Sequence, residues 1–479
     1  MNYSIIVYIL GWVMTFESAF MLLPCLTAFI YKEENGLIFL ICAVVTAIVG
    51  RLMTIKKPAN NMFYAKEGFV AVALSWIVLS IIGAVPFYAS GEIPRPIDAI
   101  FEVVSGFTTT GASILSDIES MSRCMLLWRS FTHWIGGMGV LVFLLAILPM
   151  TGGQNIYLMR AESPGPSVGK LVPKMRKTAM VLYMIYTVLT LAEIIFLIVG
   201  KMPVFDAVCT AFGTAGTGGF GIKNDSISGY SSYIQIVVTI FMFLFGVNFN
   251  FYFFVLVKKF KDAFSMEEVK WYFILYIGSV VAITINITNN ISNLGGNLKH
   301  AAFQTASIMT TTGFSTADFD SWPQFSRALL VVLMFIGACA GSTGGGMKVS
   351  RIILYVKYFK KEVSASLHSR SVKIIKSDDK VLEGSIIKAT IGFLMAYIIV
   401  TIVSFLLVSL NNFDLETSFT AVVATLNNIG PGLSRVGPTC NFNLFSDFSK
   451  SVLIFDMLAG RLELFPILIL FAPQTWRRG

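Results

Sequence analysis

Long apolar runs recur along this sequence, and they limit its fold class more strictly than any other feature. Each is about as long as an α-helix needs to cross roughly 30 Å of hydrocarbon. Because lipid offers no hydrogen-bond partners, the backbone of such runs must be helical. The composition agrees, since 55% of the residues are hydrophobic and 13% are charged. The sequence therefore predicts an all-α integral membrane protein. The runs are Phe69–Tyr88, Leu126–Met150, Met180–Val199, Ile234–Val257, Trp271–Thr288, Ile386–Leu410 and Val452–Ala472.

Two further apolar runs, Ile5–Ile30 and Leu37–Ile55, precede this series. The first is too long for the core of a signal peptide and contains Glu17. We therefore expect residues 1–60 to form a retained two-helix membrane extension.

The net charge of +9 would suggest a nucleic-acid partner in a soluble protein. Here most of the Lys and Arg residues lie in alternate loops, which is the pattern of the positive-inside rule. We therefore expect no nucleic-acid partner, and we expect the basic segments and both termini to face the cytoplasm. The basic segments are 51–66, 160–177, 258–270, 348–388 and 477–478.

Four short segments rich in Thr, Gly or Asn form an internal repeat. Each follows an apolar run, a turn and a short apolar stretch of half the crossing length, and each precedes a second apolar run. This order predicts four tandem units of span, re-entrant half-helix and span, over residues 61–155, 156–260, 261–360 and 361–479. The segments, aligned on Gly111, Gly218, Gly313 and Gly430, are SGFTTTGAS (105–113), AGTGGFG (215–221), MTTTGFS (309–315) and LNNIGPG (426–432).

Non-helical backbone at membrane depth is tolerated only where it is buried in protein or lines a watery cavity. A single TTTG segment is more often a helix kink or a packing site. Four copies in register favour a pore, because a ring of main-chain carbonyl oxygens can replace the hydration shell of a small cation. The C-terminal ends of four half-helices would add partial negative charge. Oxygen ligands without a carboxylate cage favour a monovalent ion.

Two features are candidates for a gate. Five of the ten residues Gly337–Gly346 are glycine, and each costs about 1 kcal/mol relative to alanine inside a helix, so we expect the predicted span 325–359 to break there. A close-packing surface of small residues is the alternative. Arg461 lies near the middle of the last predicted span, where its charge needs protein or water around it, and an ion pair with Glu463 or Asp456 is an alternative role.

Other motifs carry less weight. Gly216–Gly221 fits the GxGxxG pattern of dinucleotide sites, but no strand precedes it. The three histidines lack zinc spacing, and no catalytic constellation is present. We therefore expect neither an enzyme nor an organic cofactor on this chain.

Taken together, these motifs resemble the TrkH/KtrB/HKT superfamily of potassium-translocating proteins, and specifically its TrkH-like branch. The resemblance rests on TTTGAS (108–113), HWIGGMGV (133–140), AILPMTGG (146–153), YLMRAESPGP (157–166), TGGF (217–220), TTTGF (310–314), LNNIGPG (426–432) and GRLELFP (460–466). It implies K⁺ as the transported ion and a homodimer in which each protomer has its own pore around a pseudo-fourfold axis. It also implies a cytosolic, nucleotide-binding TrkA-like regulatory subunit, which could dock on 348–388 and 160–177.

The resemblance also implies site residues. The K⁺ filter would be Thr109, Thr110, Gly111, Gly216, Thr217, Gly218, Thr311, Thr312, Gly313, Asn428, Ile429 and Gly430. The gate would be the loop 337–348 with Arg461, and its residues are Gly337, Gly341, Ser342, Thr343, Gly344, Gly345, Gly346 and Lys348. We expect a gated potassium-uptake pore in the cytoplasmic membrane. A potassium symporter coupled to sodium or protons is the alternative, and a non-transport scaffold would not need four matched segments.

Overall fold

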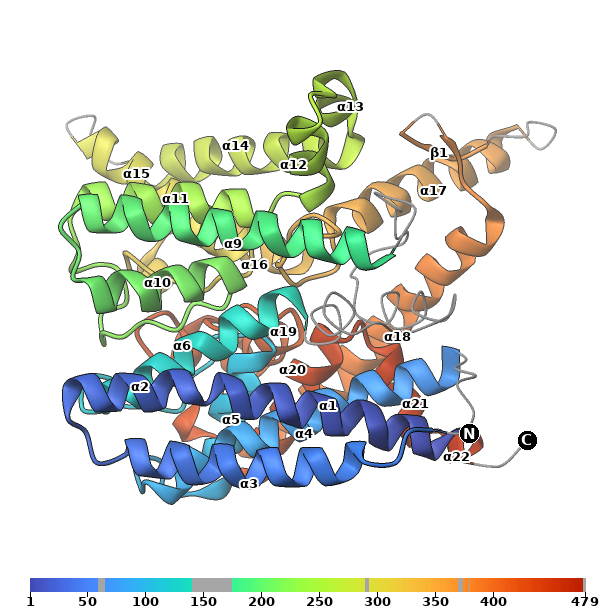
Figure 1. The fold of residues 1–479 in the computed structure, drawn as a ribbon. Coiled ribbons are helices and arrows are strands. Elements are labelled where there is room, and N and C mark those ends of the chain that lie inside the picture. Colours follow the sequence, from blue (N-terminus) through green and yellow to red (C-terminus); the bar gives the residue numbers. More distant parts are fainter. Residues whose placement is uncertain (59–64, 140–174, 289–292, 369–373, 379, 477–479) are drawn as a thin grey trace.

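The computed structural model describes residues 1–58, 65–139, 175–288, 293–368, 374–378 and 380–476, which are almost entirely helical (Figure 1). Helices α1 (Tyr3–Phe20), α2 (Leu22–Tyr31) and α3 (Gly36–Thr54) form the N-terminal extension that the sequence predicts. Glycines let α1 and α3 approach closely, since a Cβ on Gly11 would lie 2.8 Å from the main-chain oxygen of Gly50.

The rest of the chain repeats one order of helices four times, as predicted. Each unit has a long first helix, a short helix that we call a half-helix, and a second helix. The first helices are α4 (Ala65–Ala89), α9 (Met175–Val199), α14 (Glu267–Ile287) and α18 (Gly384–Val408). The half-helices are α5 (Pro96–Phe107), α10 (Val204–Gly216), α15 (Leu294–Met309) and α19 (Leu415–Leu426). The second helices are α6 (Arg123–Met138), α11 (Ser232–Phe245), α16 (Gln324–Ile336) and α20 (Asp447–Arg461).

Local sequence explains where three of the half-helices begin. Pro96 occupies the first position of α5, where its missing N–H costs no helical hydrogen bond, and Pro203 precedes α10. The side chain of Asp414 caps α19 by accepting a hydrogen bond from the Thr417 amide at 2.9 Å. Protein surrounds the C-terminal ends of all four half-helices, and their last residues are buried.

The second helices are shorter than the spans predicted from the sequence. The predicted span 232–257 is divided into α11 and α12 (Phe249–Leu256), which are bent by 90°. The predicted span 450–472 is divided into α20 and α21 (Phe465–Phe471), with positive φ at Glu463 and Leu464 between them. Hydropathy averaged over a span does not reveal such breaks, because a single polar residue at each break, Asn248 or Glu463, changes the mean of its apolar neighbours little. Six described helices are long and apolar enough to cross a membrane, or seven if α11 and α12 count as one span.

The remaining elements lie mainly at the ends of the units. The helices are α13 (Phe260–Ser265), α17 (Val349–Leu367), α22 (Pro473–Trp476), η2 (Phe319–Ser321), η3 (Ser409–Asn411), η4 (Ser434–Val436) and η5 (Phe442–Leu444). An antiparallel hairpin pairs β1 (Lys376–Ser377) with β2 (Lys380–Val381). The start of α1, the helix α22 and this hairpin lie at one end of the molecule (Figure 1).

Some features predicted from the sequence lie outside the described residues. They are the end of the span 125–149, the motifs at 146–153 and 157–166, most of the basic segment 160–177, and the boundary between residues 155 and 156.

Candidate functional site

Each half-helix ends in the same left-handed turn. The turn residue has a φ between 53° and 58°, and the amide of the next residue donates to the carbonyl five positions earlier, at 2.8–2.9 Å. This is the geometry of a Schellman cap, which usually employs glycine. The turn residues here are Thr109, Thr217, Thr311 and Asn428. The four repeats therefore share one backbone conformation at the point where the helix stops.

Two residues beyond each turn, a glycine also has positive φ, and these glycines form a closed ring. A Cβ on each glycine would approach or overlap a main-chain oxygen of the next repeat, so only glycine fits. The contacts are Gly111 with Gly218 O, Gly219 with Thr312 O, Gly313 with Ile429 O, and Gly430 with Thr110 O. Because the last contact returns to the first repeat, the four segments surround one axis.

The ring corrects the alignment of the second repeat by one residue. The repeat in the sequence predicts that Gly218 matches Gly111, but the glycine with positive φ in that repeat is Gly219. Gly218 corresponds to Thr110, while Gly216 is the last residue of α10. The sequence could not decide between two adjacent glycines, because the choice depends on which one faces the backbone of another repeat.

Threonine side chains brace the segments. The hydroxyl of Thr108 lies 2.8 Å from that of Thr110, and the hydroxyls of Thr310 and Thr312 lie 2.7 Å apart. The side-chain Nδ2 of Asn428 donates to the Thr110 hydroxyl at 3.0 Å, joining the fourth segment to the first. These hydroxyls therefore bond to each other in pairs, and that of Thr110 also bonds to Asn428.

In the second repeat Gly218 stands at the position of Thr110 and has no hydroxyl, and His133 braces this segment instead. Its Nδ1 lies 2.7 Å from the Gly106 oxygen, so Nδ1 carries the hydrogen and donates. Its Nε2 accepts from the Phe220 amide at 3.2 Å. The ring is fully buried against Gly218. Sequence pattern did not predict this role of His133, although the residue lies in the motif HWIGGMGV.

A buried ion pair also holds the first two segments, and the sequence did not reveal it. The Glu102 carboxylate accepts from Arg129 Nε at 2.6 Å and from the Ile114 amide at 2.9 Å. Arg129 Nη1 donates to the Gly221 oxygen at 2.7 Å. The pair thereby connects Ile114, which follows the first segment, with Gly221, which ends the second segment.

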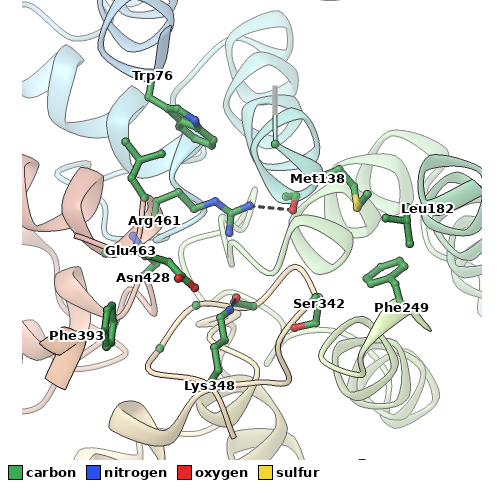
Figure 2. Close-up of a pocket in the computed structure, with 18 residues that line it drawn as sticks. Trp76, Met138, Leu182, Phe249, Ser342, Lys348, Phe393, Asn428, Arg461 and Glu463 are labelled. Carbon is green, nitrogen blue, oxygen red and sulfur yellow. Dashed lines mark hydrogen bonds between the residues drawn. The ribbon is translucent and has the colours of Figure 1, made fainter. Parts of the chain in front are cut away.

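Cavities flank the ring. One of about 190 Å³ is lined by the four ring glycines and by residues that follow them, including Lys223 and Cys440. Another, of about 80 Å³, is lined by Asn428 of the fourth turn, the loop glycines Gly344–Gly346, Lys348 and Arg461 (Figure 2).

The loop 337–348 separates α16 from α17, so the break predicted from its glycines is present. It lies directly against the turns of the half-helices. The Gly345 amide donates to the Thr311 hydroxyl at 2.6 Å, and the Gly346 amide donates to the Asn427 oxygen at 3.1 Å. Positive φ at Gly337, Gly341 and Gly346 lets the backbone reverse within this short distance.

Other residues of the loop reach the second repeat. The Thr343 hydroxyl donates to the Phe245 oxygen at 3.2 Å, and the Gly341 oxygen accepts from the Phe249 amide at 3.0 Å. The loop therefore occupies the break between α11 and α12. Ser342 lines the cavity, and Lys348 donates within the loop to the Gly344 oxygen.

Arg461 is the last residue of α20, and its guanidinium joins two other repeats. It donates to the Thr343 oxygen at 2.9 Å and to the Gly137 oxygen at 2.8 Å, and it also donates to the Gly136 oxygen (Figure 2). Its charge thus faces the oxygens at the C-terminal end of α6, where the helix dipole favours a cation. Of its suggested acidic partners, Glu463 accepts from Arg351, and Asp456 accepts from Ser404 at 2.6 Å.

Within the described ranges, no group of three His, Cys, Asp or Glu residues is placed to hold a metal ion. The GxGxxG pattern at 216–221 forms the end of α10 and the ring segment.

Comparison with known proteins identifies the family. The family model described as TrkH, cation transport protein, matches residues 36–478. The chain belongs to the TrkH family. It is 37% identical over 484 residues to the Trk system potassium uptake proteins TrkH of Salmonella typhimurium and Escherichia coli, with all of each chain covered. It is 31% identical to TrkG of Escherichia coli, covering 99% of this chain and 98% of that protein.

A solved structure agrees with this assignment. The crystal structure of the potassium transporter TrkH from Vibrio parahaemolyticus matches with a TM-score of 0.89 and 33% identity over all of both chains. Membership of the TrkH family confirms the resemblance noted in the sequence and the all-α membrane fold. It also confirms that the chain is a transport protein and not an enzyme.

Proposed function

We propose that this chain takes up potassium ions across the cytoplasmic membrane through a gated pore formed by its own four repeats. The observation that carries the proposal is the closed ring of glycines, which brings four non-helical segments together at the ends of four buried half-helices. Main-chain oxygens in such a ring can replace the hydration shell of an alkali ion. The names of the relatives, potassium uptake proteins, support potassium as the ion.

The proposed filter consists of the turn residue, the next residue and the ring glycine in each repeat. In three repeats these are the residues expected from the sequence, and the second repeat contributes Thr217, Gly218 and Gly219. Gly216 then belongs to the half-helix that points at the site. The proposed pore units remain residues 61–155, 156–260, 261–360 and 361–479, with 1–60 outside the pore.

The loop 337–348 and Arg461 are the proposed gate. The loop lies against two of the four half-helix turns, and Arg461 holds it to the first repeat. A positive charge at this position repels the ion while the loop obstructs its path. A membrane potential drives each ion inward with about 2.3 kcal/mol per 100 mV when the gate opens.

We further propose that the protein is a homodimer with cytoplasmic termini, and that a TrkA-like cytosolic subunit binds nucleotide and controls the gate. The segment of α17 and the β1–β2 hairpin is basic and projects from the helical body (Figure 1), which supports it as the docking surface.

Reconstituted protein tests the pore directly. Bi-ionic reversal potentials in liposomes, with and without the cytosolic subunit, should report potassium and rubidium permeating far better than sodium. Flux that strictly requires a second ion gradient would instead favour symport with sodium or protons. Deletion of Gly344–Gly346 and the Arg461→Ala substitution should each raise basal rubidium flux. Unchanged leak in both variants would eliminate the proposed gate.

A further inference from the structure

The first turn of α14 contacts the loop 337–348 through Glu268. The Glu268 oxygen Oε1 accepts from the Ala340 amide at 2.6 Å and from the Ser350 amide at 3.0 Å. Ala340 lies within the loop, and Ser350 lies in the first turn of α17. One carboxylate oxygen therefore holds the backbone on both sides of the glycine-rich stretch Gly341–Gly346.

The second oxygen of the same carboxylate reaches the break in the second repeat. Oε2 of Glu268 accepts from the Asn248 side-chain amide at 3.3 Å, and Asn248 caps α12 by accepting from the Asn250 amide at 2.9 Å. The loop is bonded to the same break through Cys339, whose amide donates to the Gly246 oxygen at 3.1 Å. Glu268 is therefore the point where the loop, α17 and the α11–α12 break meet.

The neighbouring residue connects this turn to the outer end of the molecule. The Glu267 carboxylate pairs with Lys357 of α17 at 2.5 Å, and Lys357 also donates to the Lys376 oxygen of β1 at 2.7 Å. The Glu267 amide donates to Asp378 in the turn of the hairpin at 2.8 Å, so the hairpin caps the N-terminus of α14.

We propose that Glu268 is a positioning residue of the gate, which holds the loop in its closed form, and that Glu267 couples this turn to the β1–β2 hairpin. This proposal rests on the gating role proposed for the loop. A partner that displaces the hairpin would remove the cap of α14 and strain the Lys357 pair. The turn would then shift, and Glu268 would release the two amides. A cytosolic signal thereby reaches the loop without any contact between the partner and the pore.

Rubidium uptake and single-channel recording of the full-length protein in liposomes test the proposal. Glu268→Ala should raise basal flux at least about tenfold, since one lost hydrogen bond to a charged group is enough to shift a two-state equilibrium by that factor. Unitary conductance and the bi-ionic reversal potential should stay as in the wild type, because Glu268 does not touch the filter. Lys357→Ala should raise basal flux by a smaller factor.

A matched control is Glu383→Ala. Glu383 is the residue directly before α18, the first helix of the fourth repeat, and its side chain accepts from Ser385 at 3.1 Å, a contact that does not involve the loop. The basal flux of Glu383→Ala should equal that of the wild type. Wild-type leak in Glu268→Ala together with raised leak in the Gly344–Gly346 deletion would overturn this inference and leave the proposed gate intact. Wild-type leak in both would overturn both.

If Glu268→Ala is not recovered as folded protein, a second pair of variants tests the positioning role of Glu268. Glu268→Gln keeps one acceptor oxygen at the same reach, whereas Glu268→Asp keeps the charge but is too short to reach both amides. Positioning by hydrogen bonds requires the aspartate variant to leak more than the glutamine variant. The reverse order would show that charge alone matters, and it would refute the proposal.

Discussion

The α-carbon of Gly111 lies against the main-chain oxygen of Gly218 in the next repeat, with no space between them for a side chain. The same relationship recurs between each ring glycine and the neighbouring segment, so backbone contacts limit how far the ring can narrow. Close-packed backbone cannot yield by a rotamer change, and added atoms must therefore displace a segment. Substitutions around this ring therefore test its role in ion selectivity directly.

The corrected register of the second repeat predicts different behaviour for two adjacent glycines. Gly219→Ala should reduce potassium selectivity, because its Cβ would overlap the Thr312 oxygen at a positive φ. A fall in the potassium-to-sodium permeability ratio of about tenfold corresponds to roughly 1.4 kcal/mol of lost discrimination. Bi-ionic reversal potentials measure this ratio.

Gly218→Ala should also impair the protein, but for a reason that can be removed. Its Cβ would overlap the His133 ring, and Gly218 has an ordinary φ, so trimming the histidine creates space. Selectivity of the double variant Gly218→Ala/His133→Ala should match that of His133→Ala alone. The combination of Gly219→Ala with His133→Ala should show no such recovery, and recovery there would restore the original alignment.

Two substitutions of Arg461 separate the effect of its positive charge from the effect of its hydrogen-bond geometry. Lysine keeps the charge but lacks the planar fork that reaches the oxygens of Thr343 and Gly137 together. Basal rubidium flux should therefore increase in the order wild type, Arg461→Lys, Arg461→Ala. A leak in the lysine variant equal to that of the alanine variant would mean that only the hydrogen bonds matter.

Removing one partner of the pair Glu102–Arg129 should strongly destabilise the protein. Both side chains are at most 2% exposed, and Glu102→Ala would leave a buried guanidinium without its counter-charge. Removing one partner of such a pair typically costs about 3–5 kcal/mol. Thermal unfolding in detergent, followed by size-exclusion chromatography, should show a large loss of monodisperse protein.

The matched control for that experiment is Arg95→Ala. Arg95 pairs with Asp447 while its side chain is 53% exposed, and exposed pairs contribute at most about 1 kcal/mol. A comparable loss of stability in both variants would contradict the assignment of Glu102 and Arg129 as an internal brace.

Asn428 occupies the position that threonine holds in the other repeats, and its longer side chain joins the fourth segment to the first. Asn428→Thr should remove its bonds to the Thr110 hydroxyl and the Met457 oxygen. We expect a modest fall in potassium-to-sodium selectivity with little change in basal leak. A variant with raised leak and intact selectivity would place Asn428 in the gate instead.

Much of this architecture follows from the sequence alone. The apolar runs require membrane helices, and the fourfold recurrence of the Thr/Gly segments after half-length stretches predicts the repeats. The glycines of 337–346 predict a broken helix, because the free-energy cost of glycine in a helix is local and does not depend on tertiary contacts. These features depend on residues adjacent in the chain, and the family assignment adds that the chain transports cations.

Other features depend on contacts between residues that are distant in the sequence. Gly219 and not Gly218 belongs to the ring because it faces the Thr312 oxygen. His133 can brace the second segment because it bonds to Gly106 and Phe220. The loop is held in place partly by its bond to Glu268. The loop bonds to Gly246 and Phe249 on either side of the break at 246–248, and the break at 462–464 comes directly after Arg461, which bonds to Thr343 of the loop. Short-range pattern determined that the four Thr/Gly segments and the loop 337–348 leave the helix. Only the tertiary structure decided which atoms they meet, because those atoms come from other repeats.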